Sequence, residues 1–208
     1  MNVTIIGAGN MGAALAKQLA LAGHQVRVTA RDLDKAAVLN RSGVVVVPAH
    51  QAAENADAII VATSYDDAIA ALASVGSLAG KVVIDITNPL SADYMSLTLG
   101  YTTSAAEEIA SAFPDAGVVK GFNTLFAQVI AAGADFGNGQ KASTFVASNS
   151  ERAKQTASTL AQSMGFEVVD AGDLKNARYL EPLAGLNIYL GYGAGLGTSI
   201  APTWLQRA

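Results

Sequence analysis

The segment NVTIIGAGNMG, residues 2–12, decides the fold, because it places three glycines directly after a short β-branched run. Small residues and good helix formers continue from Asn10 to Ala22, and QVRVTA, residues 25–30, has the composition of a second strand. The G-x-G-x-x-G motif therefore lies between a strand and a helix in a βαβ unit of roughly 30 residues, the context in which it indicates a dinucleotide-binding site.

Each glycine of this motif has a physical role. Gly7 permits the tight turn after the strand, Gly9 leaves room for a pyrophosphate beside the backbone, and Gly12 lets the helix pack closely on the strand. The N–H groups and positive dipole end of a helix that begins near Asn10 would face the phosphates. The alternative is a glycine-rich turn without a ligand.

The end of the second strand distinguishes NAD from NADP. An NAD site carries Asp or Glu there, whereas this chain has Ala30 followed by Arg31, with Lys35 one turn further on. A guanidinium can bind a phosphate with two hydrogen bonds and stack on a purine, so we predict NADP(H). Asp32 and Asp34 would repel a phosphate and are expected to face water. Alternatively, Arg31 and Lys35 are solvated charges at a helix start.

Composition excludes several classes of protein. The chain has 208 residues, 51% hydrophobic and 14% charged, with net charge −4 and no cysteine. These values favour one globular domain and argue against a nucleic-acid surface and a disulfide framework. Residues 183–206 carry no formal charge, but their many glycines disfavour a membrane span, so we expect a covering segment instead. The first strand begins at once, so a cytoplasmic enzyme is the default expectation.

Strand and helix patterns alternate after this unit, which predicts an α/β doubly wound parallel sheet of the Rossmann type, with a short helical and glycine-rich carboxyl-terminal lobe. The whole chain, 1–208, is predicted to be a single domain with 174–208 as an extension. The further predicted strands are 43–48, 57–62, 81–85, 117–120, 143–147 and 166–170. A helix is predicted from 174 to 192, with an interruption at Pro182.

Three strands of this pattern are followed by polar residues. Ligands bind outside the carboxyl ends of parallel strands, so these segments are predicted to converge on one cleft with the glycine loop. The alternative is that each segment is an ordinary turn whose Asn, Ser and Thr cap the next helix. The predicted site residues at the strand ends are Thr63, Ser64, Tyr65, Asn88, Pro89, Asn123 and Thr124.

No acid–base or metal-binding constellation accompanies the dinucleotide motif. His24 and His50 are predicted to be solvated turn residues, and the spacing of Lys120, Arg178 and Glu181 assigns them no role. Reduction of a ketone or imine normally needs a proton donor near the carbonyl. Hydride exchange between two redox cofactors needs mainly two stacked planar rings, which suits this sequence better.

Several motifs together resemble the F420-dependent NADP oxidoreductase family, and the resemblance covers nearly the whole chain. The cytosolic domain of the STEAP metalloreductases, which uses flavin in place of deazaflavin, is also similar. The motifs are IGAGNMG at 6–12, AR at 30–31 with Lys35, DITNPL at 85–90, VKGFNT at 119–124, and DAGDL at 170–174 with the Asn176-Ala177-Arg178 and Glu181 positions that follow.

The resemblance implies a homodimer that moves hydride between NADP(H) and F420 or a flavin. It implies contacts of Ala8, Gly9, Asn10 and Met11 with the pyrophosphate, and of Ala30, Arg31 and Lys35 with the 2′-phosphate. It places Ser64, Tyr65, Asn88 and Pro89 at the nicotinamide, with Asn123, Thr124 and Ala127 beside the facing rings. The segment 174–208 would cover the second ligand and the dimer partner. Two alternatives remain: a reductase of a small imine or hydroxy acid, and a NADPH-binding sensor without turnover.

Overall fold

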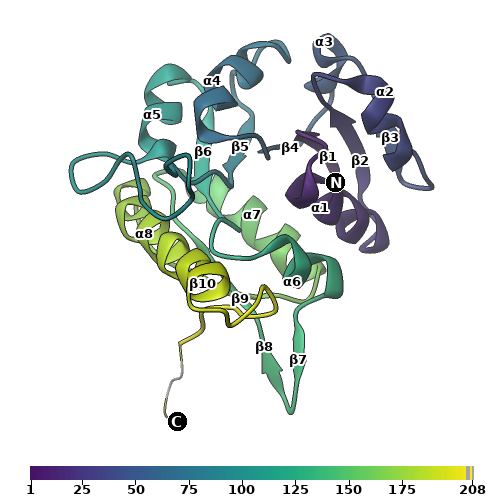
Figure 1. Ribbon diagram of the computed structural model, residues 1–208. Helices are drawn as coiled ribbons and strands as arrows, with labels where there is room; N and C mark the ends of the chain where they lie inside the picture. Colours follow the sequence, from purple (N-terminus) through teal and green to yellow (C-terminus); the bar gives the residue numbers. More distant parts are fainter. Residues whose placement is uncertain (205–206, 208) are drawn as a thin grey trace.

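The computed structural model describes residues 1–204 and 207, and its centre is a six-stranded parallel sheet. The spatial order of the strands is β3-β2-β1-β4-β5-β6, the doubly wound order of a Rossmann fold (Figure 1). This architecture confirms the predicted fold class. The strands are β1 (Asn2–Ile6), β2 (Gln25–Thr29), β3 (Val44–Val46), β4 (Ala58–Val61), β5 (Val82–Asp85) and β6 (Gly117–Lys120).

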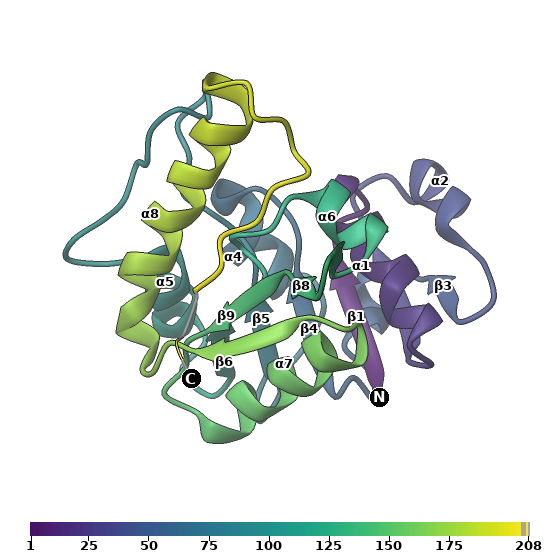
Figure 2. The same cartoon turned by 90° about the horizontal axis from the view of Figure 1, so that it is seen from below.

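Helices cover both faces of the sheet and enclose two hydrophobic clusters. One cluster packs α1, α6 and α7 against one face, and the other packs α3, α4 and α5 against the opposite face (Figure 2). The central strands β4 and β5 are buried along their whole length, as expected of strands covered on both sides. The helices are α1 (Asn10–Leu21), α2 (Leu33–Ala36), α3 (Ala49–Ala52), α4 (Tyr65–Ala73), α5 (Ala105–Ala112), α6 (Ala127–Ala132), α7 (Glu151–Ser163) and α8 (Ala177–Ile188).

The register of the sheet brings the carboxyl ends of its strands to one level. Ile6 is paired with both Thr29 and Val61, Val61 with Asp85, and Asp85 with Lys120. The loops that follow these residues therefore start from a single edge of the sheet, as the sequence predicts.

The two remaining predicted strands pair with each other instead of extending the main sheet. β9 (Ser143–Val146) and β10 (Glu167–Asp170) form a parallel pair, joined to β6 by one antiparallel bridge between Lys120 and Ala147. The β7–β8 hairpin (Asp135–Gly137 and Gln140–Lys141) was not predicted from the sequence. Its Asn138-Gly139 turn, with both residues at positive φ, is a typical two-residue hairpin signal that was available in the sequence.

The carboxyl-terminal helix continues through Pro182, so the predicted interruption is wrong. A 3₁₀ turn (Leu174–Asn176) leads into α8, and a π-helical turn (Tyr189–Gly193) ends it. Proline removes only its own N–H donor, while Leu180 and Ala184 on either side of it are buried and hold the helix in place. Of the predicted extension 174–208, residues 205, 206 and 208 lie outside the described part.

His24 is not a solvated turn residue, contrary to the prediction. Its side chain is buried, with Nδ1 3.1 Å from the amino-terminal nitrogen of Met1 and Nε2 2.9 Å from Oγ of Ser163. Burial, together with the amino-terminal charge, lowers the pKa of His24. The imidazole thus joins the start of β2 to Ser163 at the end of α7. The two residues are 139 positions apart, so no local sequence pattern reveals this contact. His50 is exposed, as predicted.

No helix among the described residues is long and apolar enough to cross a membrane.

Candidate functional site

The glycine loop has the geometry that its sequence predicts. Gly7 has φ +116°, and a Cβ there would lie 2.3 Å from the carbonyl oxygen of Ala62. A Cβ on Gly12 would lie 2.0 Å from the carbonyl oxygen of Gly7, so only glycine permits this close packing of α1. A Cβ on Gly9 would meet no protein atom within 4 Å, which leaves open space at the start of α1.

A cavity of about 710 Å³, here called the glycine-loop cavity, opens at this point. It lies between the ends of β1, β2 and β4, at the switch in strand order where such folds bind ligands. Among its lining residues are eight of the predicted site residues: Gly7, Ala8, Gly9, Ala30, Arg31, Lys35, Thr63 and Ser64. Thr29, which the sequence analysis did not select, also lines it, and its buried Oγ1 has no hydrogen-bond partner.

The two cationic side chains of the glycine-loop cavity are held loosely by carboxylates. Arg31 Nη2 lies 3.5 Å from Asp67 Oδ2, and Lys35 Nζ lies 3.2 Å from Asp32 Oδ2. Both cationic side chains are almost fully exposed, so these ion pairs are weak and can exchange for a ligand anion. Asp32 also accepts a hydrogen bond from the Lys35 backbone N–H, which explains its place at the helix start.

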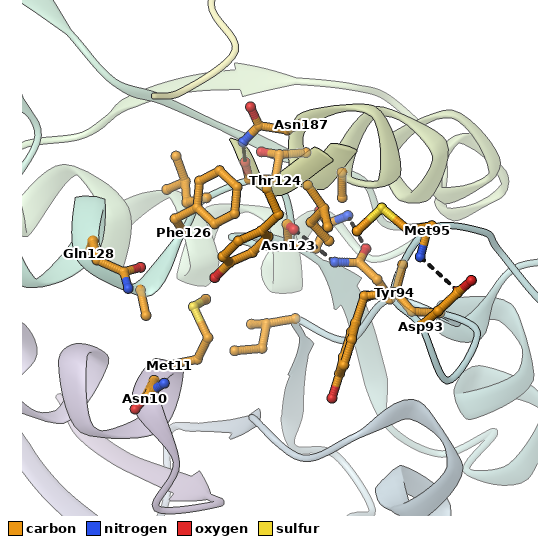
Figure 3. A pocket seen from close by; sticks show the side chains of 18 residues that line it. Asn10, Met11, Asp93, Tyr94, Met95, Asn123, Thr124, Phe126, Gln128 and Asn187 are labelled. Carbon is orange, nitrogen blue, oxygen red and sulfur yellow. Dashed lines mark hydrogen bonds between the residues drawn. The ribbon is translucent and has the colours of Figure 1, made fainter. Parts of the chain in front are cut away.

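A second cavity, of about 500 Å³, adjoins the first along the glycine loop and is here called the aromatic cavity. Figure 3 shows Asn10 and Met11 below it, Phe126 and Thr124 above it, and Tyr94 and Met95 at one side. Six predicted site residues line it: Asn10, Met11, Asn88, Asn123, Thr124 and Ala127. Lining residues that the sequence analysis did not select include Asp93, Tyr94, Met95, Phe126, Asn187 and Tyr192.

Two asparagines form the polar wall of the aromatic cavity. Asn123 Nδ2 donates to Asn88 Oδ1 at 2.9 Å and to the carbonyl oxygen of Leu180 at 3.0 Å. Asn88 Nδ2 in turn donates to the Asn123 carbonyl oxygen. These bonds use the amide hydrogens of Asn123, and its Oδ1 is buried without a hydrogen-bond partner. Oγ1 of Thr124 is also buried and has no partner. Unpaired buried polar atoms are costly, so these two atoms are candidates for hydrogen bonds with a ligand or with water.

The carboxyl-terminal lobe closes one side of the aromatic cavity. Ala184, Asn187 and Ile188 of α8 line it, and Asn187 Nδ2 donates to the carbonyl oxygen of Thr124 at 3.0 Å. In the π-helical turn, a Cβ on Gly191 would lie 2.6 Å from Cζ of Phe126, so the turn packs directly on the cavity wall. A π-helical turn of this kind is common at functional sites.

Three predicted site residues line neither cavity. Gly12 is packed beneath the loop, and the Pro89 carbonyl accepts hydrogen bonds from the backbone and side chain of Thr98. The Tyr65 hydroxyl donates to Oε2 of Glu108. Burial is the larger cause, and the Glu108 carboxylate the next, of a rise in the pKa of Tyr65 to about 12. Their positions indicate structural roles close to the site.

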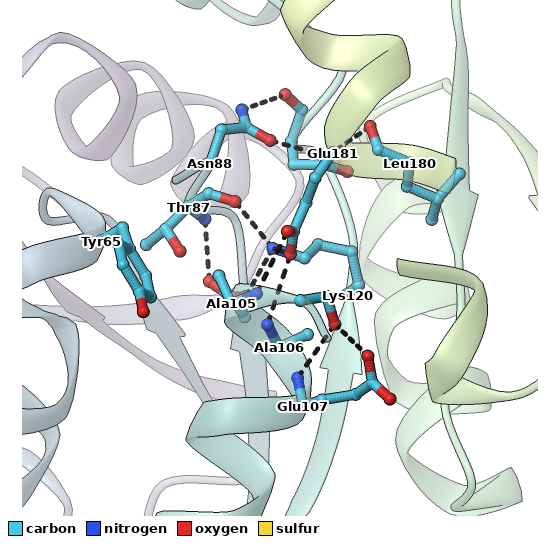
Figure 4. Close-up of polar contacts among 12 residues, drawn as sticks. Tyr65, Thr87, Asn88, Ala105, Ala106, Glu107, Lys120, Leu180 and Glu181 are labelled. Carbon is cyan, nitrogen blue, oxygen red and sulfur yellow. Dashed lines mark hydrogen bonds and ion pairs between the residues drawn. The ribbon is translucent and has the colours of Figure 1, made fainter. Parts of the chain in front are cut away.

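Behind the wall lies a buried charge network that the sequence analysis missed. Lys120 Nζ contacts Asp85 Oδ2 at 2.6 Å, Glu181 Oε1 at 2.8 Å and the carbonyl oxygen of Thr87 at 2.7 Å. Figure 4 shows Thr87 and Glu181 beside the ammonium group of Lys120. The ammonium thereby has two carboxylates and one carbonyl oxygen as partners, and a charge can be buried when it is paired in this way. The network anchors the loop that carries Asn88.

Glu181 links this network to two helices. Its carboxylate also accepts the backbone N–H groups of Ala105 and Ala106, which are the first residues of α5. Burial raises the pKa of Glu181, an effect that Lys120 and the N–H groups oppose. A negative charge at a helix amino terminus is stabilising, so Glu181 both pairs Lys120 and caps α5. This contact fixes α8 against the sheet edge.

The strand order and the cavity at the switch point define the class: a Rossmann-type dinucleotide-binding protein. The profile of the family described as "NADP oxidoreductase coenzyme F420-dependent" matches residues 2–89. The F420-dependent NADP reductase of Methanothermobacter marburgensis is 32% identical over 209 residues, covering 91% of this chain and 92% of that protein. The chain belongs to this family of NADP-dependent oxidoreductases.

Two further comparisons extend the similarity. Metalloreductase STEAP3 of Rattus norvegicus is 33% identical over 181 residues, or 87% of this chain, but the chain spans only 36% of that protein's length. A solved structure from an Arthrobacter species, described as an F420-dependent NADP reductase, has a TM-score of 0.88 and 31% identity. The match covers 99% of this chain and all of that one, so the carboxyl-terminal lobe is part of the shared fold.

Proposed function

We propose that this protein exchanges hydride between NADP(H) in the glycine-loop cavity and a planar heterocycle, F420 or a flavin, in the aromatic cavity. The observation that carries this proposal is that consecutive residues of the glycine loop and the start of α1 line the two cavities. Gly7, Ala8 and Gly9 line one, and the next residues, Asn10 and Met11, line the other. A ligand that extends from the glycine loop into the aromatic cavity would meet a second molecule there.

The residues of the glycine-loop cavity fit NADP(H). The open space at Gly9 and the uncapped start of α1 suit a pyrophosphate. Arg31 and Lys35 suit a 2′-phosphate, because their present carboxylate partners are exposed and exchangeable. The unpaired Oγ1 of Thr29 offers a hydrogen bond to a ribose. When bound, NADPH supplies the hydride.

The chain's own residues then position and shield the second ring. Phe126, Tyr192 and Met11 provide flat or polarisable surface, and the unpaired Oδ1 of Asn123 offers an acceptor to a ring N–H. Among the described lining residues, the ionisable groups are Asp93, Tyr94 and Tyr192. Their exposed positions suit binding at a rim more than proton delivery to a buried carbonyl. Hydride exchange between two rings requires no such delivery.

We further propose that the protein acts as a cytoplasmic homodimer. The carboxyl-terminal lobe exposes Tyr179, Leu186, Tyr189 and Leu196, and a second copy would cover such an apolar surface. In this arrangement the predicted extension would serve both the second ligand and the interface.

Anaerobic mixing of the protein with NADPH and F420, FMN or riboflavin tests the proposal. Absorbance of the reduced nicotinamide should fall together with that of the oxidised acceptor, with one hydride lost per hydride gained. Turnover of small cyclic imines but of no planar acceptor would favour the imine-reductase alternative. Tight NADPH binding without hydride loss to any acceptor would favour a sensor.

A further inference from the structure

The charge of the aromatic cavity is unusual for a site that receives a phosphorylated coenzyme. Of the 18 described residues that line it, Asp93 alone carries a charge, and none is lysine or arginine. By contrast, the glycine-loop cavity contains two cationic side chains, Arg31 and Lys35, together with the carboxylates Asp32 and Asp67. Sites that bind phosphate or several carboxylates normally supply cationic side chains or an extended helix amino terminus.

Asp93 is held in place at the tip of an ordered turn. Its Oδ1 accepts hydrogen bonds from Oγ of Ser91 at 2.6 Å and from the N–H of Met95 at 3.0 Å. The next residue, Tyr94, has φ +61°, a conformation that the turn maintains. The hydrogen bonds lower the pKa of Asp93, so its carboxylate is ionised at neutral pH. Figure 3 shows Asp93 at the rim, beside Tyr94 and Met95.

The interior of the aromatic cavity offers neutral hydrogen-bonding groups. Asn123 Oδ1 and Thr124 Oγ1 are buried and unpaired, one an acceptor and the other both donor and acceptor. Together they match a ring edge on which an N–H lies beside a carbonyl group, as in a flavin. The start of α6 at Ala127 also lines the cavity, but a helix of six residues provides little dipole for an anion.

We propose that Asp93 makes this protein select uncharged planar acceptors, so that an unphosphorylated flavin such as riboflavin is preferred over FMN, FAD and F420. This inference rests on the proposed function and specifies the substrate class of the same site. The carboxylate at the rim repels a phosphate or oligocarboxylate tail, and no described lining residue compensates it. NADPH bound at the glycine loop would add further negative charge near Asn10 and Met11, which increases the discrimination.

Steady-state rates with saturating NADPH provide the first test. In low salt, kcat/KM for riboflavin should exceed that for FMN by roughly threefold to tenfold, and the ratio should fall at high ionic strength as the charge is screened. Asp93→Asn keeps the turn's acceptor atom and should reduce the ratio, whereas Asp93→Lys should invert it by raising kcat/KM for FMN. For riboflavin, which carries no charge, both substitutions should change kcat/KM less than they change it for FMN.

Asp135→Asn is the matched control, because Asp135 is also exposed and its Oδ1 also accepts a backbone N–H, from Gly137, far from the cavity. Asp135→Asn should leave the ratio of kcat/KM for riboflavin to kcat/KM for FMN unchanged. Quenching of riboflavin and FMN fluorescence by the NADP⁺-loaded protein gives the same comparison without turnover, and the affinity ratio should follow the same order.

Two results would overturn the inference: equal or greater preference of the wild-type protein for FMN or F420, or a ratio that Asp93→Lys does not move. Failure of the proposed function is distinguishable from either. In that case no acceptor is reduced, and the binding comparison still decides: tighter riboflavin binding upholds the charge selection, whereas absence of flavin binding overturns both proposals.

Discussion

Lys120 Nζ lies 2.8 Å from Oε1 of Glu181, and this buried ion pair joins the last strand of the main sheet to the carboxyl-terminal helix. Lys120 is 0% exposed and Glu181 is 1% exposed, so water cannot replace either partner. The Asn123 side chain donates to the carbonyl oxygen of Leu180, the residue before Glu181. The ion pair therefore sets the position of the wall of the aromatic cavity as well as that of the helix.

Loss of the Glu181 carboxylate is expected to destabilise the protein strongly. Glu181→Ala leaves two N–H groups of α5 and one donor of Lys120 unpaired in the interior, at a cost of about 3–5 kcal/mol of unfolding free energy. Urea denaturation followed by circular dichroism measures this. Glu107→Ala is the control, because it breaks the partly exposed Glu107–Arg178 pair and should cost about 1 kcal/mol or less. A loss below that of the control would contradict the assigned role.

The contributions of Glu181 and Glu107 to the free energy of unfolding are expected to change with pH in opposite directions. Burial raises the pKa of Glu181, so the folded protein keeps this proton to higher pH than the unfolded chain. Its contribution to stability is therefore complete below the unfolded value, 4.5, and is lost as pH rises through the folded pKa. The stability difference between the wild type and Glu181→Gln should narrow as pH rises above this value.

Burial raises the pKa of Glu107, but hydrogen bonds from Arg178 and Ser104 lower it by more. The pKa of Glu107 therefore lies below its usual value of 4.5. Its contribution is present above 4.5 and is lost as pH falls through the folded pKa. The difference between the wild type and Glu107→Gln should widen with rising pH in the acidic range. Denaturation curves between about pH 2 and pH 8 measure both differences. Parallel pH profiles for the two variants would contradict the assignment.

The sequence predicted the sheet and the glycine loop because both depend on local signals. Gly7, Gly9 and Gly12 are required by the backbone geometry of a single turn, and the alternation of strands and helices determines the class of fold. The loops at Thr63 and Asn88 could be placed by topology alone, since parallel strands end at one edge.

The Lys120–Glu181 pair could not be found in this way. Its members are 61 positions apart and look like ordinary surface residues, because burial of a charge depends on a partner that only the fold supplies. The position of His24 against Ser163 is hidden for the same reason. Asp93 lies in a loop without periodicity, and its place at the cavity rim follows from the turn that Ser91 and Met95 stabilise.

Alanine substitutions at two glycines should separate packing from ligand binding. A Cβ on Gly12 would collide with a backbone oxygen, so Gly12→Ala should cost about 1–3 kcal/mol of unfolding free energy or more. A Cβ on Gly9 meets no protein atom and the residue has φ −72°, so Gly9→Ala should change stability by less than about 1 kcal/mol.

The same methyl group on Gly9 would occupy the space proposed for the pyrophosphate. NADPH affinity of Gly9→Ala, measured by isothermal titration calorimetry, should therefore fall at least about tenfold, which corresponds to 1.4 kcal/mol. Wild-type affinity in this stable variant would show that the pyrophosphate does not approach the backbone at Gly9.

Arg31 and Asp67 together are expected to set the preference for NADPH over NADH. Arg31→Ala removes a charge-assisted contact to a 2′-phosphate and should weaken NADPH binding by about tenfold, while NADH, which lacks that phosphate, should bind as before. Asp67→Asn should act in the opposite direction, because it releases Arg31 from the carboxylate 3.5 Å away and removes a negative charge from the cavity.

Dissociation constants for both nucleotides, measured at low and high salt, test this pair of predictions. Arg41→Ala is the control, because this exposed arginine lies outside the glycine-loop cavity and should leave both constants unchanged. The gain from Asp67→Asn should disappear in Arg31→Ala, since the carboxylate acts mainly through the guanidinium. Equal loss of NADPH and NADH affinity in Arg31→Ala would mean that Arg31 contacts a part common to both nucleotides, and the 2′-phosphate would need another partner.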